Sequence, residues 1–85
     1  MSAYACTDPD FVLVAIADLQ ADQAHPLDAS RLQSVRQAMG GGVPLPAVVL
    51  QRWKAINFVI DGWHRVSVAG ELGLTHLPAR LLPPP

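Results

Sequence analysis

The sequence lacks the features that mark secreted and membrane proteins. Cys6 is the single cysteine, so no intrachain disulfide can form and nothing indicates an oxidising compartment. No apolar run approaches the roughly 20 residues that cross a bilayer, and the N-terminus lacks the basic start and apolar centre of a signal peptide. We therefore expect a cytoplasmic protein without membrane contact, in which Cys6 is a passive thiol.

Charge is scarce as well. Only 15% of the residues are charged and the net charge is −1, which argues against strong non-specific binding to nucleic acid. The distribution is uneven: residues 1–42 carry five acidic and two basic side chains, a net charge of −3, whereas residues 43–85 carry four basic and two acidic ones, a net charge of +2. The basic half favours a small anion as ligand, and DNA contact is expected only indirectly or weakly.

Hydrophobic residues are abundant, at 51% of a chain of 85 residues. A chain of this length forms one small domain that buries roughly 60–65% of its unfolded surface. We expect a flexible leader over residues 1–10, a folded domain over residues 11–82 and a proline tail over residues 83–85. Because so small an apolar domain leaves non-polar surface exposed, a homodimer or a protein partner is plausible.

The first half of the domain predicts one strand and one helix. The apolar run over residues 11–16 has the length of a strand buried on both faces, and residues 18–27 read as irregular. Ser30 and Gln33 form a capping-box pattern at the start of a helix. That helix presents Leu32, Val35 and Met39 on one face and ends at the three glycines of residues 40–42.

The second half predicts a hairpin, a helix and a last strand. Strands over residues 47–52 and 55–60 are joined by a turn at residues 53–54, which implies an antiparallel pair. We expect the side chains of Ile56, Phe58 and Ile60 to face inward. A helix over residues 62–72 follows, ending at Gly73 and packing through Val66, Ala69 and Leu72, and then a strand over residues 77–82.

These elements predict a small α+β domain with a mixed sheet, in the order strand-helix-strand-strand-helix-strand.

The most informative segment is Ile60-Asp61-Gly62-Trp63-His64-Arg65, where a strand ends in Asp-Gly and a helix begins at once. Backbone N–H groups at a helix N-terminus are unpaired, and the peptide dipoles add positive potential there. His64 and Arg65 lie in the first turn. The segment therefore predicts an anion site, most plausibly for phosphate.

Each residue of this segment also has a structural interpretation. Arg65 could pair with a nearby carboxylate instead of a phosphate, and Asp61 could cap the helix instead of acting as a base. His64 could contact the anion, act in acid–base catalysis or do neither. Gly62 would let the backbone approach a phosphate. Trp63 could stack on a base, although packing against the sheet is the simpler role.

Other candidate sites have weaker sequence support. Residues 40–42 could wrap phosphates, but without a following Gly-Lys-Ser/Thr they do not form a P-loop. Ser67 is a conceivable phosphoacceptor. A metal site could be imagined with Asp61, His64 and His76 as ligands. The sequence has no His/Cys spacing typical of zinc, so no metal site is predicted.

The chain resembles the N-terminal, ParB-like nuclease domain of ParB partition proteins, within the ParB/sulfiredoxin superfamily. The resemblance extends over about residues 12–82. It rests on an ordered set of residues: Val14-Ala15-Ile16-Ala17-Asp18-Leu19, then Asp28, Leu32, Val35 and Met39, then Pro44-Leu45-Pro46-Ala47-Val48-Val49, Ile60-Asp61-Gly62-Trp63-His64-Arg65, Ala69, Glu71-Leu72-Gly73 and Leu77-Pro78-Ala79.

The resemblance implies a nucleotide-handling fold in which Gly62, Trp63, His64 and Arg65 hold a nucleoside triphosphate, CTP or ATP, together with Mg²⁺. Partition proteins of this superfamily bind CTP, sulfiredoxins use ATP, and some relatives phosphorylate free serine or are described as nucleases. The fold alone does not choose among these activities.

This sequence departs from the family pattern at several positions, and these differences argue against some of the family's activities. Trp63 stands where sulfiredoxins have the reacting cysteine, which argues against sulfiredoxin activity. Compared with the Gly-Glu-Arg-Arg of partition proteins, Trp63 replaces the acid, His64 the first arginine and Ser67 a later arginine. The loss of that acid argues against metal-assisted hydrolysis.

Three hypotheses follow. The first is a nucleotide- or phosphate-binding domain of a plasmid- or phage-type partition or regulatory protein that acts with a DNA-binding partner. The second is a small phosphoryl-transfer enzyme or nuclease that uses Asp61 and His64 as catalytic residues. The third is a degenerate copy of the fold that serves only in protein interaction.

Overall fold

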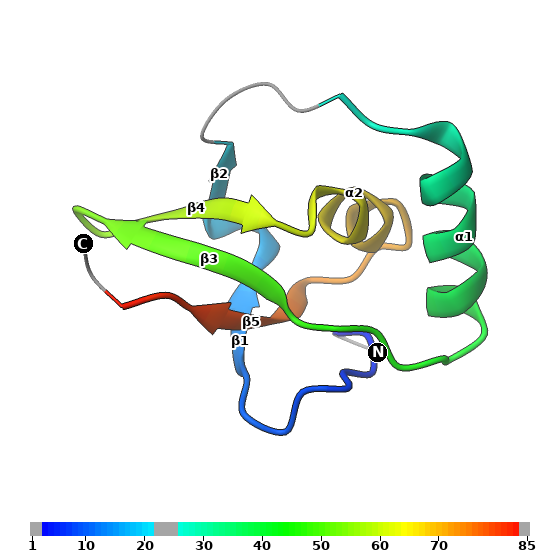
Figure 1. The fold of residues 1–85 in the computed structure, drawn as a ribbon, viewed down its shortest axis with the longest axis horizontal. Coiled ribbons are helices and arrows are strands. Elements are labelled where there is room, and N and C mark those ends of the chain that lie inside the picture. The colour runs from blue at the N-terminus through cyan, green and yellow to red at the C-terminus, as the bar shows by residue number, and fades with distance from the viewer. Residues whose placement is uncertain (1–2, 22–25, 84–85) are drawn as a thin grey trace.

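The computed structural model describes residues 3–21 and 26–83, which form a five-stranded sheet with two α-helices at one end (Figure 1). In chain order the elements are β1 (Val12–Ala15), the short 3-10 helix η1 (Ile16–Asp18), β2 (Leu19–Ala21), α1 (Ala29–Gly40), β3 (Val48–Trp53), β4 (Ile56–Asp61), α2 (Trp63–Glu71) and β5 (His76–Leu81).

The strand order in the sheet is β1-β5-β3-β4-β2. β3 and β4 form the predicted antiparallel hairpin, β1 is antiparallel to β5, and the β3–β5 and β2–β4 pairs are parallel. β1 and β2 lie at opposite edges although only η1 separates them in the chain, so the sheet must curl to bring its two edges together. The predicted fold class, a small α+β domain with a mixed sheet, is confirmed.

The two helices pack on each other, and α2 lies between the sheet and α1 (Figure 1). The predicted face of α1 enters the core, with Met39 4% exposed and Leu32 and Val35 packed against the buried cluster. The buried cluster consists of Tyr4, Met39, Val48, Leu50, Val59, Val68, Ala69, Leu77 and Ala79. This core fixes the start of α2 against β3 and against α1.

Residues 11–21 differ from the prediction in two ways. β1 is not buried on both faces: Val12 and Leu13 are about half exposed, and β1 lies at the edge of the sheet, paired with β5. The region predicted to be irregular contains β2, which pairs with β4. A three-residue strand is too short to show periodicity, and its pairing depends on a partner far along the chain.

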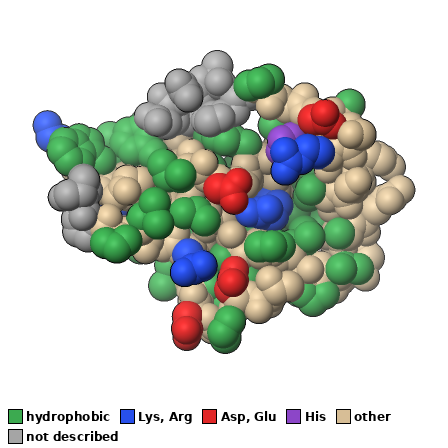
Figure 2. All heavy atoms as spheres, in the orientation of Figure 1, with side chains coloured by type: hydrophobic (Ala, Val, Ile, Leu, Met, Phe, Trp, Pro, Cys, Tyr) green, Lys and Arg blue, Asp and Glu red, His purple; other side chains and the backbone are tan. Residues whose placement is uncertain are grey.

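The predicted orientation of β4 is wrong. Ile56 and Ile60 are exposed and Phe58 is half-buried, whereas Val59 is fully buried. Period-2 alternation groups these residues correctly but does not say which group faces the core. The group that faces the core is that of Val59, and it also contains the polar residues Asn57 and Asp61. Because the opposite group is more apolar, the hydrophobic pattern predicted the wrong face to be buried. Figure 2 shows the resulting hydrophobic side chains over β3 and β4.

Two details of the helices also differ. Asp28, not Ser30, is the N-cap of α1: its Oδ1 accepts hydrogen bonds from the Arg31 amide at 2.9 Å and from the Ser30 hydroxyl at 2.6 Å. In α2, Val66 and Ala69 pack against the core as predicted, but Leu72, the C-cap, is exposed, and Val68, which was not predicted to pack, is fully buried. Both helices end at glycines, as predicted, with Gly41 the C-cap of α1 and Gly73 in the left-handed region.

Residues 3–10, for which the sequence predicts a flexible leader, contact the body of the protein. Tyr4 is 5% exposed and belongs to the core cluster. Cys6 is partly buried and forms an isolated parallel bridge with Leu45. This segment therefore lies against the chain that leads into β3.

The β3–β4 turn predicts a stabilising substitution. Lys54 and Ala55 have φ values of +49° and +67°, which cost a residue other than glycine about 1–2 kcal/mol. Ala55→Gly is expected to raise the free energy of unfolding by about 0.5–1 kcal/mol, measured by urea denaturation. Ala38→Gly, inside α1, is the matched control and is expected to lower it by about 1 kcal/mol. Equal losses in both variants would contradict the turn geometry.

Candidate functional site

The connection from β4 to α2 requires glycine at position 62. Gly62 is the N-cap of α2 with φ of +112°, in the left-handed region. A Cβ built on it would lie 2.6 Å from Cγ1 of Val48 and 3.1 Å from Nη2 of Arg65. The helix therefore starts in direct contact with β3 and with the arginine of its own first turn. Val66 donates to the Gly62 carbonyl at 2.9 Å, so the amides of the preceding first turn point out of the helix end.

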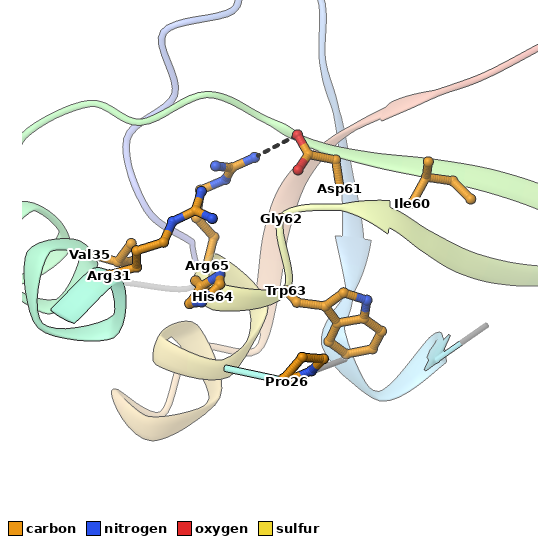
Figure 3. A pocket seen from close by; sticks show the side chains of 9 residues that line it. All are labelled: Pro26, Arg31, Val35, Ile60, Asp61, Gly62, Trp63, His64 and Arg65. Atoms are coloured by element: carbon orange, nitrogen blue, oxygen red, sulfur yellow. Dashed lines mark ion pairs between the residues drawn. The ribbon is translucent and has the colours of Figure 1, made fainter. Parts of the chain in front are cut away.

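Arg65 folds back under this helix end. Its side chain is only 18% exposed, and its Nη2 lies 3.4 Å from the Ala47 carbonyl oxygen and 3.8 Å from Oδ2 of Asp61 (Figure 3). Its Nε is buried and has no hydrogen-bond partner among the residues that the structure describes. A guanidinium has five N–H donors, so the contacts present leave most of its hydrogen-bonding capacity unused. A buried cation in this state is suited to receive an anion.

A cavity of about 190 Å³ opens beside Arg65. Its walls are Pro26, Arg31, Val35, Ile60, Asp61, Gly62, Trp63, His64 and Arg65. Figure 3 shows the guanidinium groups of Arg31 and Arg65 turned toward the same space, one from α1 and one from α2. Within the described part of the chain, Arg31 makes no ion pair. The cavity thus joins the first turns of both helices and carries two arginines and one carboxylate.

The predicted residues of the 61–65 segment therefore meet at one cavity, and α1 contributes Arg31, which was not predicted to belong to the site. Arg31 lies three residues after the N-cap Asp28, so its position in a first helical turn could be read from the sequence. That this turn faces α2 could not, because it depends on how the helices pack.

His64 connects the two helix starts. Its Nε2 accepts a hydrogen bond of 3.0 Å from the backbone N–H of Asp28. Accepting at Nε2 requires the neutral imidazole to carry its proton on Nδ1. His64 therefore fixes the N-terminus of α1 relative to that of α2, and Nδ1 is the nitrogen that remains for a ligand.

Asp61 and Trp63 flank Gly62. Asp61 is not the helix cap: it is the last residue of β4, its side chain is 74% exposed, and the N-cap Gly62 provides no side-chain cap. Its carboxylate stands at the wall of the cavity, in an ion pair with Arg65 but largely exposed, so that it can also contact a ligand or the ligand's counter-ion. Trp63 packs against the core cluster, in keeping with its simpler predicted role, and also lines the cavity.

The remaining candidates lie elsewhere. None of residues 40–42, Ser67 and His76 lines this cavity. Over residues 3–21 and 26–83, no group of three or more potential metal ligands comes together.

Two carboxylates near the helix ends have lowered pKa values, from which we can predict how the stability of the fold depends on pH. Hydrogen bonds from Ser30 and from Arg36 lower the pKa of Asp28 and of Glu71, respectively. Arg36 and Glu71 join α1 to α2 through two 2.7 Å contacts. A group with a depressed folded-state pKa stabilises the fold above its unfolded pKa, and this contribution disappears as the pH falls through the folded value.

We therefore expect the melting temperature to fall on acidification, and Asp28→Asn and Glu71→Gln to flatten that dependence. The measurement is thermal unfolding between neutral and acidic pH. Asp10→Asn, which neutralises an exposed carboxylate in the segment before β1, is the control and should leave the slope unchanged. An unaltered slope in both test variants would contradict the prediction.

Comparison with solved structures identifies the fold. A sulfiredoxin from Arabidopsis thaliana superposes with a TM-score of 0.75 at 12% sequence identity, covering 87% of this chain and 85% of that one. A free serine kinase in complex with AMP superposes with a TM-score of 0.73 at 18% identity, covering 93% of this chain and 33% of that one. The chromosome-partitioning protein ParB from Caulobacter crescentus, complexed with CTP-gamma-S, gives 0.70 at 16% identity, covering 86% and 44%.

This domain therefore has the fold of the ParB/sulfiredoxin superfamily, and the resemblance inferred from the sequence is confirmed at the level of fold. It spans about a third of the serine kinase and less than half of the ParB chain. No protein-family model and no curated protein matches the sequence. In the described part of the chain, no helix has the length and apolar character needed to cross a membrane.

Proposed function

We propose that this domain binds a nucleotide through its phosphate groups, at the cavity between the first turns of α1 and α2. The observation that carries the proposal is the Arg65 guanidinium, which is largely buried and has an unpartnered Nε at the N-terminal end of α2. Burying a cation without full hydrogen bonding is unfavourable, so a site that maintains one is suited to an anionic ligand.

The volume of the cavity indicates which part of a nucleotide it can enclose. Ligand pockets for molecules of drug size enclose roughly 300–1,000 Å³, whereas this one encloses about 190 Å³. The enclosed part therefore suits phosphate groups, held by Arg65, Arg31 and the first-turn amides of α2, with the nucleoside in the open part. Asp61 could hold Mg²⁺ together with the phosphates, since Mg²⁺ commonly takes one or two carboxylates and substrate oxygens.

CTP and ATP are the two nucleotides we propose to compare. Three solved structures with this fold support the choice by their ligands: the free serine kinase carries AMP or ADP, and the Caulobacter ParB carries CTP-gamma-S.

The biological role we propose is that of a partition or regulatory protein of the plasmid or phage type, acting in the cytoplasm. The net charge of −1 is a poor match to DNA, so a partner would supply the DNA contacts. Alternatively, a second copy of the domain in a homodimer could supply additional surface for these contacts.

A second candidate function is phosphoryl transfer or nuclease activity. It is favoured by the exposed Asp61 carboxylate at the cavity wall, a position from which it could act as a general base on a bound ligand. His64 could take part only through Nδ1, since Nε2 is bonded to α1. Nucleotide hydrolysis that is lost in Asp61→Asn while binding persists would support this candidate.

The test is isothermal titration of the purified protein with ATP, CTP and inorganic phosphate, with and without Mg²⁺. Saturable binding of phosphate or nucleotide is the expected result. A folded protein that binds none of them would overturn the proposal and favour the third hypothesis, a copy of the fold used only for protein interaction.

A further inference from the structure

The N-terminal segment is bound to the chain that leads into β3. The Tyr4 hydroxyl donates a 2.8 Å hydrogen bond to the Pro46 carbonyl, and Oδ2 of Asp8 accepts one of 2.8 Å from the Ala47 amide. Between them, Thr7 donates to the Leu45 carbonyl and the Leu45 amide donates to Ala5, both at 2.9 Å. Four hydrogen bonds thus fix residues 45–47 from one side.

The segment fixed in this way contacts the arginine of the proposed anion site. The Ala47 carbonyl is an acceptor for Arg65, at 3.4 Å from Nη2. The next residue, Val48, is the one that Gly62 contacts. A shift of residues 46–48 would therefore move both the guanidinium and the start of α2.

Tyr4 and Arg65 are also electrostatically linked. Burial raises the pKa of Tyr4 to about 12, and the positive charge of Arg65 and a side-chain hydrogen bond with Arg65 oppose that rise. The phenol is therefore neutral at physiological pH and remains a hydrogen-bond donor to Pro46. Because Tyr4 is the single tyrosine of the sequence, its ring signals report on this contact alone.

We propose that Tyr4 and Asp8 are positioning residues of the anion site: by fixing residues 46 and 47, they hold the Arg65 guanidinium in the geometry that receives phosphate. This inference rests on the proposed function for its effect on binding, but the placement of Arg65 can be measured without a ligand. It assigns a role to a segment that the sequence pattern marked as a leader.

The variants separate positioning from folding and from charge. Tyr4→Phe keeps the buried ring and removes the hydroxyl. Asp8→Ala removes the acceptor, and Asp8→Asn keeps an acceptor oxygen while removing the charge. Asp10→Ala is the matched control, since it removes an equal charge from the same segment at an exposed residue.

Two readouts are needed, both on the full chain. The first is the hydrogen exchange rate of the Arg65 Nε–H, followed by ¹⁵N NMR without ligand. It is expected to be slow in the wild type because this atom is buried, and faster in Tyr4→Phe and Asp8→Ala. The second is affinity for inorganic phosphate and ATP, expected to fall about three- to tenfold in those two variants. Asp8→Asn and Asp10→Ala should behave like the wild type or bind slightly more tightly.

The outcomes distinguish the two proposals. Unchanged Arg65 exchange in Tyr4→Phe and Asp8→Ala would overturn the positioning role, whatever the affinities. Loss of affinity with equal effects of Asp8→Asn and Asp8→Ala would overturn it as well, because the acceptor would then not matter. Faster Arg65 exchange in a protein that binds neither phosphate nor nucleotide would support the positioning role and overturn the proposed function.

Discussion

Gly62→Ala is expected to destabilise the domain by about 2–4 kcal/mol and to disrupt the anion site together with it. Two effects combine: a φ of +112° is strained for alanine, and the new Cβ would lie 2.6 Å from the fully buried Val48. Because β3 cannot move without disturbing the core, the start of α2 must shift instead. Urea denaturation measures the loss of stability, and phosphate titration measures the accompanying loss of affinity.

Two other glycines provide matched controls. Gly73 also has a positive φ, of +76°, but a Cβ there meets nothing within 4 Å, so Gly73→Ala should cost only about 1 kcal/mol. Gly70 lies within α2 with open space around it, and Gly70→Ala should stabilise the helix by roughly 0.5–1 kcal/mol. If Gly62→Ala cost no more than Gly73→Ala, the close contact with Val48 would be refuted.

Arg65→Met is expected to have the second large effect: it should weaken phosphate binding without lowering the free energy of unfolding. Affinity for phosphate should fall about 10- to 100-fold, since a charge-assisted contact typically contributes about 1.5–3 kcal/mol. The free energy of unfolding should stay constant or rise, because an apolar chain of similar length replaces a buried cation whose Nε has no partner. Titration and denaturation of the same preparations give both values.

Arg65→Lys and Arg80→Met complete the comparison. Lysine keeps the charge but not the planar fork of donors, so it should recover only part of the affinity. Arg80 is an exposed arginine of β5 that does not line the cavity, and its loss should leave phosphate binding unchanged. A strongly destabilised Arg65→Met variant would instead indicate that Arg65 holds the fold together.

Several features could be predicted from sequence because they are local. The strand-to-helix junction at Asp61 and Gly62 is encoded by an apolar run, a glycine and a helical pattern in direct succession. The hairpin of β3 and β4 follows from two runs separated by a short turn. The fold class, a small α+β domain with a mixed sheet, was predicted as well and is confirmed, whereas the order of the strands in the sheet was not predicted.

Other features depended on packing and were missed or wrong. Which face of β4 is buried was predicted incorrectly, because Ile56, Phe58 and Ile60 are more apolar than Asn57, Val59 and Asp61, whereas the core lies on the side of Val59. β2 was missed because its three residues form a strand only through pairing with β4. Tyr4 gave no sign in the sequence that it would enter the core.

The start of the candidate site follows from residues that are neighbours in the chain: a glycine lies between a strand and a helix, and His64 and Arg65 follow in the first helical turn. Folding is what brings Arg31 of α1 to the site. It also places His64 within hydrogen-bond distance of the Asp28 amide and buries Arg65 next to the Ala47 carbonyl. The physical reason is the range of the interactions. Chain conformation and helix dipoles arise between neighbours in sequence, whereas burial and the convergence of charges arise between residues that folding alone brings together.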